Sequence, residues 1–428
     1  RPRDPHAGQA LVRARAAAVG CPHGPGKGPA AVPAAGIIAA MTTTSPRPLA
    51  ADALLDRFLD WQIAARHYPG AVVHVERQGR VLASRTAGVL DPGSGTPMPE
   101  DALFRIASMT KPLVSVLALM LVEQGRLALD EPVSQRLPEL AALKLGSGRP
   151  PQRAPTIRDL LRHTSGFAYA GEIGDPSVRG AALAADIDGR LPLLAPDALL
   201  AELAALPLAF EPGTRFGYGF STDVLGLVIE RITGMRLGDA LREALLDPLG
   251  MRDTGFEVPA DAAARLVRGF DDDRGWRGFD DKYALAQQRG TPMHSGGGGL
   301  VSSMADYVRF ARMLVDGGLA GGRRFLSDAS LRQMFSDQLD PMVPGPAGFT
   351  GPGFGFGLGF AVRLDWGACA TPSRAGELTW FGICGTVLWL QPRERWFAIQ
   401  LSANMRSRML SRMEFRRTVQ FLLDEAER

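Results

Sequence analysis

The chain has 428 residues, of which 46% are hydrophobic and 22% are charged, which excludes a wholly disordered protein and a small disulfide scaffold. No apolar run reaches the roughly 18 residues that a membrane-spanning helix needs. The formal net charge is +3, but residues 1–49 carry +5 and the remainder carries −2, so the main body lacks the basic excess of a nucleic-acid-binding protein.

The first 49 residues are rich in Ala, Pro, Gly and Arg and show no periodic apolar pattern. This composition predicts a disordered tail or leader. Residues 18–21 (AVGC) faintly resemble a lipoprotein cleavage site, but Arg13 and Arg15 interrupt the apolar run that should precede it. We therefore expect a cytoplasmic protein, with secretion as the weaker alternative.

Globular patterning begins near residue 50, where apolar residues at helical spacing predict a helix over 52–66. Residues 71–76 and 80–86 have the composition of two strands around a tight turn. From residue 108 to about residue 290 helical patterns dominate, with helices predicted at 113–124, 156–163, 197–205, 221–233 and 237–246.

The C-terminal part returns to strands. A helix is predicted after Met304, a glycine-rich loop at 344–355, strands at 357–364, 378–390 and 395–403, and a final helix at 411–426. This order predicts an α/β (α+β) protein whose antiparallel sheet is built from both chain ends and flanked by helices. The α/β part covers about 50–111 and 300–428, and a mainly helical part, about 112–299, is inserted between them.

Several site classes lack their sequence signals. The three cysteines, Cys21, Cys369 and Cys384, are odd in number and show no CxxC spacing, and no HExxH occurs, so we expect neither a disulfide framework nor a metal site. The absence of Gly-x-Gly-x-x-Gly and of a P-loop gives no reason to expect a cofactor. The absence of Gly-x-Ser-x-Gly excludes the nucleophile elbow of α/β-hydrolases.

Ser108 and Lys111 are candidate catalytic residues, because three-residue spacing places them on one face of a helix. The following residues, 113–122, are almost wholly apolar, which predicts a buried helix with Ser108 at its N-terminus, where backbone N–H groups favour negative charge. A serine nucleophile needs a base, and a desolvated lysine can serve where an arginine cannot. Ser-x-x-Lys also arises by chance, but only four of the 48 basic residues are lysines.

Further blocks follow in order along the chain: FRIASMTK (104–111), TIRDLLRHTSG (156–166), EPGTRFGY (211–218), LG (225–226), PLGM (248–251) and GGGGL (296–300). Together they resemble the serine β-lactamase and penicillin-binding-protein superfamily, and within it the class C-like family VIII carboxylesterases. The resemblance implies a β-lactamase-like catalytic domain over 50–428, with Ser108 as nucleophile and Lys111 beside it.

The resemblance also implies that Tyr218, in Tyr218-Gly219-Phe220, is the second base or proton shuttle. From its sequence neighbours alone, Tyr218 would equally be a half-buried packing residue. Phe220 departs from the lactamase pattern, in which an Asn at this position contacts the substrate amide, and this puts lactam substrates in doubt.

Two segments compete for the third motif, Lys-Thr-Gly in lactamases. We choose Trp380-Phe381-Gly382 over His294-Ser295-Gly296, because it lies in a strand that leads into the terminal hairpin and helix. It resembles the Trp-Gly-Gly of the esterases, with Phe381 as a departure. The resemblance further implies that the N–H of Ile383, with that of Ser108, forms the oxyanion hole.

Two residues of the 156–166 block and its surroundings complete the set. By resemblance Tyr169 is a substrate-binding tyrosine, whereas a structural role is more typical for His163. We predict a serine hydrolase for short, uncharged esters, which makes a small-molecule ester the expected partner. A β-lactamase or D-alanyl peptidase, an acyltransferase and a non-catalytic scaffold on this fold remain alternatives, and the oligomeric state stays open.

Overall fold

The computed structural model describes residues 51–269, 290–341, 343–365, 368–369 and 371–427. The tail or leader predicted over residues 1–49 lies outside the described residues. Residues Pro48–Arg428 form one unit by their internal contacts.

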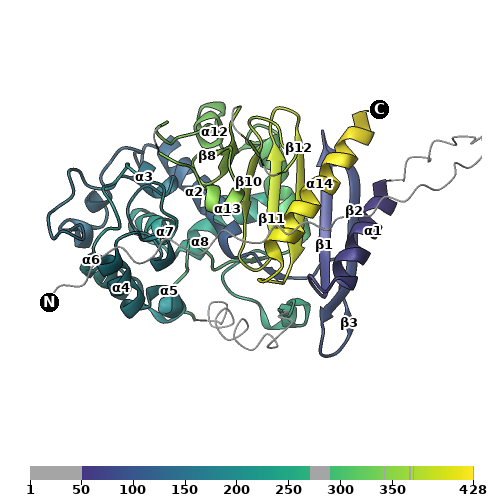
Figure 1. Cartoon of the computed structure of the whole chain (residues 1–428), viewed down its shortest axis with the longest axis horizontal. Coiled ribbons are helices and arrows are strands. Elements are labelled where there is room, and N and C mark those ends of the chain that lie inside the picture. Colours follow the sequence, from purple (N-terminus) through teal and green to yellow (C-terminus); the bar gives the residue numbers. More distant parts are fainter. Residues whose placement is uncertain (1–50, 270–289, 342, 366–367, 370, 428) are drawn as a thin grey trace, which may run out of the picture. The chain divides into compact units, whose positions relative to one another are not determined.

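The described chain is organised around an eight-stranded sheet of order β3-β2-β1-β12-β11-β10-β9-β8 (Figure 1). The strands are β1 (Gly70–Arg77), β2 (Arg80–Asp91), β3 (Thr96–Pro97), β8 (Phe354–Phe356), β9 (Ala361–Arg363), β10 (Leu378–Phe381), β11 (Val387–Gln391) and β12 (Trp396–Ser402). β1 pairs antiparallel with β12, from Ala71 opposite Ser402 to Arg77 opposite Trp396. The sheet therefore joins both chain ends, which confirms the predicted α/β (α+β) fold class.

Helices cover both faces of this sheet. The side chain of Gln400 on β12 donates to Ser411 of α14 (Arg408–Glu427) at 2.8 Å. Glu76 on β1 lies opposite Phe397, an odd number of residues from Gln400, and it accepts from Arg312 of α11 (Met304–Val315) at 2.8 Å. Because side chains alternate along a strand, α14 and α11 lie on opposite faces.

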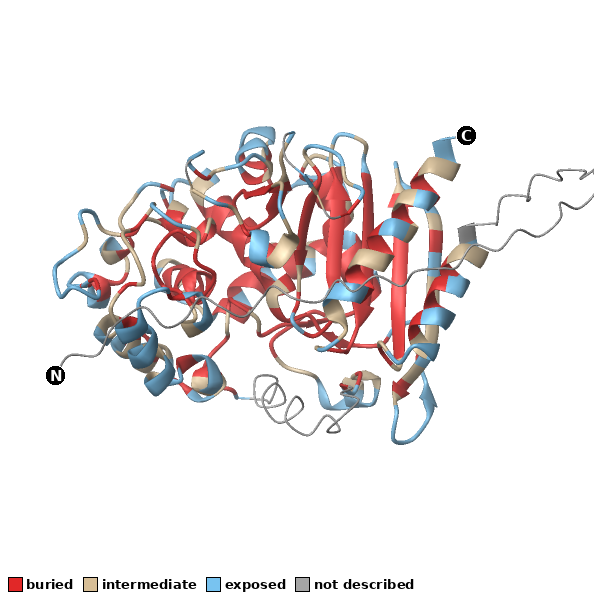
Figure 2. Cartoon of the chain, viewed as in Figure 1, coloured by how far each residue is buried: buried red, intermediate tan, exposed pale blue. Residues whose placement is uncertain are grey.

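The first helix, α1 (Ala51–Ala64), packs beside α14 in front of the sheet in Figure 1. Rings from the two helices meet there, since the centroids of Phe58 and Phe415 are 5.7 Å apart. Figure 2 shows the central strands as an almost continuous buried layer under these helices, whereas β2 and β3 at one edge are largely intermediate or exposed. The apolar faces that the sequence predicts for the two terminal helices therefore pack against the sheet.

The inserted part is mainly helical. Its α-helices are α2 (Thr110–Glu123), α3 (Ile157–Leu161), α4 (Pro176–Ala185), α5 (Ile187–Arg190), α6 (Pro196–Ala205), α7 (Ser221–Thr233), α8 (Leu237–Leu241) and α9 (Asp247–Leu249), with a π-helical turn, η6 (Arg242–Leu246), between the last two. Helix α7 packs against α2, α3 and α8. The helix predicted at 221–233 coincides with α7, whereas the one predicted at 237–246 continues through η6 into α9.

Short elements complete the described chain. They are β4 (Phe104–Arg105) with β5 (Val301–Ser302), the hairpin of β6 (Leu319–Ala320) and β7 (Arg323–Arg324), helices α12 (Asp328–Phe335) and α13 (Ala347–Thr350), and the 3₁₀ turns η1 (Ala107–Met109), η2 (Val133–Gln135), η3 (Pro138–Leu140), η4 (Ala170–Glu172), η5 (Leu191–Leu193) and η7 (Ala260–Arg265). Among all the helices of the described residues, none has both the length and the apolarity to cross a bilayer.

Three predictions for the C-terminal half are wrong in detail. The strand predicted at 357–364 is the second half of a hairpin, because Gly359 has φ +103° and turns the chain between β8 and β9. The strand predicted at 378–390 is β10 and β11, separated at Gly385, which has φ +112°. The loop predicted at 344–355 contains α13 and the start of β8.

The start of α3 is fixed by a buried carboxylate. The Thr156 side chain accepts from the backbone N–H of Asp159, and the Asp159 carboxylate accepts from that of Thr156, which forms a capping box. Thr164 Oγ1 also donates to Asp159, at 2.8 Å, and Arg153 pairs with it. Burial alone would raise the pKa of Asp159, but the hydrogen bonds from Arg153, Thr156 and Thr164 outweigh it and lower the pKa to about 2.

Asp159→Asn is therefore expected to lower the free energy of unfolding by about 2 kcal/mol at neutral pH. The folded-state pKa lies below the usual 3.8, so this contribution is present above about pH 4 and is lost as the pH falls towards 2. Urea denaturation between pH 7 and pH 2.5 measures it, with the exposed Asp197 replaced by Asn as control. A difference between Asp159→Asn and wild type that does not shrink with falling pH would contradict the assignment.

Candidate active site

Ser108 is held at a turn between a short strand pair and α2. β4 pairs with β5, and the N–H of Ile106 donates to the Leu300 carbonyl at 3.1 Å. Ala107 then has φ +44°, in the left-handed region that non-glycine residues rarely adopt. Strained backbone of this kind is common at functional sites, and here it immediately precedes the predicted nucleophile.

Lys111 lies in the first turn of α2 and is 1% exposed. Its Nζ donates to Ser108 Oγ at 3.2 Å and to the Gly297 carbonyl at 2.6 Å. The helix around it is buried from Thr110 to Leu121, as the apolar run predicted. The structure therefore places the two predicted catalytic side chains in direct contact.

Tyr218 completes this cluster. Lys111 Nζ lies 4.6 Å from the centroid of its ring. The phenol oxygen is buried and has no hydrogen-bond partner among the described residues. Such a group is available to exchange a proton with a bound molecule. The three residues predicted as catalytic thus form one cluster, which we call the Ser108 cluster.

A close backbone approach sets the position of Tyr218. The Tyr169 N–H donates to the Tyr218 carbonyl at 2.9 Å, and the Phe220 N–H donates to Phe167. A Cβ on Gly219 would lie 2.1 Å from the Phe167 carbonyl oxygen. Glycine at position 219 is therefore required for the segment 218–220 to pair with 167–169.

The end of β10 lies against the backbone just before Ser108. A Cβ on Gly382 would lie 2.2 Å from the Ile106 carbonyl oxygen, so only glycine permits this approach. Thr386 Oγ1 donates to the same carbonyl at 3.2 Å. The turn that carries Ile383 is thereby held beside the nucleophile, in keeping with the expected position of an oxyanion-hole N–H.

Aromatic rings line the Tyr218 side of the site. Trp380 is buried, with its ring centroid 5.3 Å from that of Tyr218, and Phe381 stacks on it. Phe349 of α13, which the sequence did not single out, lies 5.0 Å from Tyr218. Tyr169 contacts Tyr218 at 5.7 Å between centroids. The wall of the site beside Tyr218 is therefore aromatic.

His163 packs against the same tyrosine, with 4.8 Å between ring centroids. It is buried, and its Nδ1 has no hydrogen-bond partner within the described ranges. Burial and the nearby charge of Lys111 lower the pKa of His163 well below its usual value. A neutral, packed imidazole fits the structural role expected for it.

The rejected motif at 294–296 also lies near the site. Ser295 Oγ donates to Asp223 at 2.6 Å, and His294 stacks on Phe256. The neighbouring Gly297 donates its N–H to Asp223 while its carbonyl accepts from Lys111. This segment therefore contacts Lys111 through the Gly297 carbonyl. The strand whose end lies against the backbone before Ser108 is β10, which this segment does not form.

Asp223 is a site residue that the sequence reasoning missed. It is fully buried on α7, and one carboxylate oxygen has no partner among the described residues. Burial raises the pKa of Asp223, while the Lys111 charge and the bonds from Ser295 and Gly297 oppose the rise. The signal available was an acidic residue five positions after Tyr218, directly before the apolar run of residues 224–229.

Arg412 of α14 is the second missed residue. It is buried, donates to the Gly382 carbonyl, and its guanidinium lies 4.2 Å from the centroid of the Phe381 ring. Burial, with a smaller contribution from Arg408, lowers the pKa of Arg412 to about 9. The sequence signal available was that Arg412 lies three residues before Phe415, on the same face of the predicted C-terminal helix. Arg412 thus holds the end of β10 in place.

No three His, Cys, Asp or Glu side chains gather to hold a metal ion in the ranges that the structure describes. Cys369 and Cys384 form no disulfide bond with one another, and Cys21 lies outside the described residues.

Comparisons with known proteins agree with this geometry. The family profile described as Beta-lactamase matches residues 51–420. Esterase EstB from Burkholderia gladioli is 37% identical over 348 residues, which cover 78% of this chain and 85% of EstB. Lovastatin esterase from Penicillium rubens is 32% identical over 359 residues, covering 74% and 87%. The solved structure of EstCE1, "a hydrolase with promiscuous acyltransferase activity", matches with TM-score 0.73 and 27% identity, covering 86% of this chain and 97% of its own.

Proposed function

The chain belongs to the β-lactamase family, and from this premise we propose that it is a serine hydrolase that cleaves short, uncharged carboxylic esters through an acyl-enzyme on Ser108. The observation that carries the proposal is the 3.2 Å contact of Lys111 Nζ with Ser108 Oγ, beside the unpartnered phenol of Tyr218. EstB and lovastatin esterase, both named as esterases, support the substrate class.

Acylation begins with attack of Ser108 Oγ on the ester carbonyl. Lys111 and Tyr218 together accept the hydroxyl proton and return it to the leaving alcohol, since Lys111 Nζ contacts both Ser108 Oγ and the ring of Tyr218. The developing oxyanion is stabilised by the backbone N–H groups of Ser108 and Ile383, for which the Gly382 approach provides the position.

Deacylation uses the same groups in the reverse direction. Water attacks the acyl carbonyl on Ser108, and the Lys111–Tyr218 pair takes its proton. The proton then returns to Ser108 Oγ as the carboxylic acid leaves. The Gly297 carbonyl keeps Lys111 Nζ directed at the nucleophile throughout.

The preference for uncharged esters rests on the aromatic wall. Trp380 and Phe220 are both buried, and the resemblance implies that they replace the lysine and the asparagine of the lactamases. Arg412 is near the site and donates to the Gly382 carbonyl, and its guanidinium lies over the Phe381 ring, while its Nε has no hydrogen-bond partner among the described residues. The aromatic wall offers apolar contact area to an uncharged acyl or alcohol group.

The enzyme is expected to hydrolyse p-nitrophenyl butyrate with a kcat/KM at least about tenfold above that for nitrocefin, since one missing charge-assisted contact costs that much in binding. Both values are measured on the same preparation, with Ser108→Ala as the blank for each substrate. A nitrocefin value equal to or above the ester value would overturn the substrate class but not the nucleophile.

A direct test of the function is labelling with a fluorophosphonate probe. Intact mass spectrometry should show one added probe, and peptide mapping should place it on Ser108. A probe on another residue, or none at all, would contradict the proposed acyl-enzyme.

Acyl transfer is a second candidate function, favoured by the description of EstCE1 as a hydrolase with acyltransferase activity. The same acyl-enzyme would pass its acyl group to an alcohol in place of water. Product analysis of vinyl butyrate turnover with added 1-butanol separates the two functions. Butyl butyrate as the main product would favour the transferase.

A further inference from the structure

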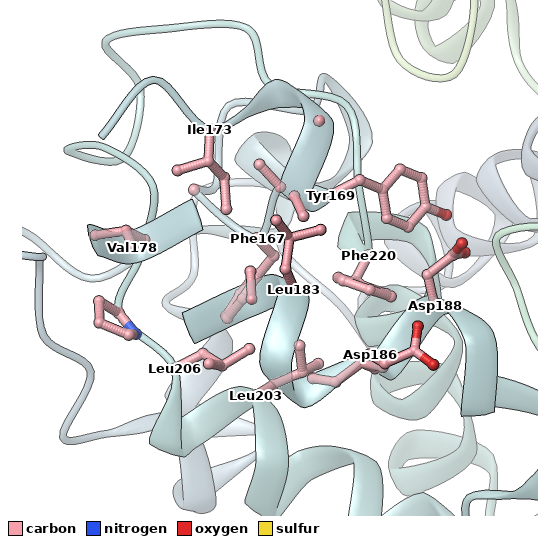
Figure 3. A pocket seen from close by; sticks show the side chains of 17 residues that line it. Phe167, Tyr169, Ile173, Val178, Leu183, Asp186, Asp188, Leu203, Leu206 and Phe220 are labelled. Carbon is pink, nitrogen blue, oxygen red and sulfur yellow. The ribbon is translucent and has the colours of Figure 1, made fainter. Parts of the chain in front are cut away.

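A cavity of about 210 Å³ lies between the segment that carries Tyr169 and helices α4 to α6 (Figure 3). Most of its wall is apolar, and the residues that contribute large side chains are Phe167, Ile173, Leu183, Leu203, Leu206 and Phe220. None of the predicted catalytic residues lines it, so this cavity is distinct from the Ser108 cluster.

The cavity nevertheless shares a wall with that cluster. Tyr169 and Phe220 line the cavity, and their rings meet edge-on at 4.7 Å between centroids. Tyr169 also contacts the ring of Tyr218 and donates its N–H to the Tyr218 carbonyl. An ester whose carbonyl is at Ser108 would therefore extend past Tyr169 and Phe220 to place a hydrocarbon chain in the cavity.

The charge of the cavity indicates what it excludes. Asp186 and Asp188 also line it, and Figure 3 shows both carboxylates on the side of Tyr169 and Phe220. A hydrocarbon chain that enters from the Tyr169 side passes both carboxylates, so a negative charge on that chain would be repelled as it enters and would then lie at the apolar end. The opposite side, toward Val178 and Leu206, is apolar and favours hydrocarbon.

The size of the cavity limits the length of the occupant. Water takes about 30 Å³ per molecule in the liquid, so the cavity has room for roughly seven non-hydrogen atoms. This is the size of a short linear or singly branched hydrocarbon chain.

We propose that this cavity binds an uncharged apolar chain of the ester, about six carbons long. The inference rests on the proposed function, because it assigns a place to one part of the ester that Ser108 attacks. Either the acyl or the alcohol part of the ester carries such a chain, and two substrate series distinguish them.

One series consists of p-nitrophenyl esters of linear acids, and the other of acetate esters of linear alcohols, each from about two to ten carbons. The wild-type kcat/KM is expected to rise by about threefold per added methylene, up to roughly six carbons, in one series. The kcat/KM should fall for hydrocarbon chains longer than the cavity can hold. A six-carbon chain that ends in a carboxylate should lose the gain.

Two exposed leucines provide a matched pair of variants. Leu183 lines the cavity and is 63% exposed, whereas Leu193 does not line it and is 60% exposed. Leu183→Trp should fill part of the cavity and lower the ratio of six-carbon to two-carbon kcat/KM about tenfold in the responding series. Leu193→Trp should keep the wild-type ratio.

The outcomes separate the two proposals. A flat wild-type profile in both series, or equal ratios in the two variants, would overturn the cavity assignment while ester turnover leaves the proposed function standing. Equal turnover of the carboxylate-ended chain would overturn the exclusion of charge. If no ester of either series is turned over and Ser108 takes no probe, the proposed function fails and the cavity assignment fails with it.

Discussion

Ser108→Ala is expected to abolish ester hydrolysis, with kcat reduced by about a thousandfold or more. The reason is that Lys111 Nζ contacts the Ser108 hydroxyl directly, and alanine leaves no atom to form the acyl bond. The measurement is kcat for p-nitrophenyl butyrate, together with the melting temperature and the circular dichroism spectrum, which should match wild type.

Ser115 offers the matched control, because it is also a buried serine on α2. Ser115→Ala should keep wild-type activity. Residual activity of Ser108→Ala within about tenfold of wild type would remove Ser108 from the role of nucleophile.

Lys111→Arg is expected to be as damaging as Lys111→Ala. Arginine keeps the positive charge but cannot release a proton at working pH. The Lys111→Arg variant should therefore be inactive if Lys111 exchanges protons with Ser108. The measurement is kcat for both variants across pH 6–9, with melting temperatures to confirm folding. If both variants are folded and lose activity to a similar extent, proton exchange by Lys111 is supported.

The control for this pair is Lys144→Arg, since Lys144 is exposed and a change there should have no effect. An arginine variant at position 111 that keeps most of the activity would show that Lys111 acts through its charge alone. Tyr218 would then be the remaining base in the Ser108 cluster.

The sequence predicted best those features that depend on local periodicity. The apolar spacing of 221–233 matches α7. The Ser108–Lys111 spacing brings the two side chains into contact, although Ser108 lies in the 3₁₀ turn that precedes α2. These features are set within a few turns of one helix, so that no knowledge of distant segments is needed. The resemblance to a known family placed Tyr218 and Trp380, whose neighbours come from distant parts of the chain.

The features that were missed depend on contacts between distant segments. The turns at Gly359 and Gly385 divide apolar runs that look continuous in the sequence. Asp223 becomes part of the site only because Gly297, far along the chain, lies between it and Lys111. Arg412 likewise reaches Gly382 only after α14 has packed on the sheet.

The pairing of β1 with β12 also has a consequence for how the protein is made. Ribosomes synthesise residues 70–77 more than 300 residues before residues 396–402, yet these strands are neighbours. β10, which flanks Ser108, is likewise made late. The growing chain therefore contains Ser108 long before the site around it can form. Until β12 has been made, one edge of β1 is unpaired and prone to aggregation. Chains that terminate before β12 should be inactive and depend on chaperones for solubility.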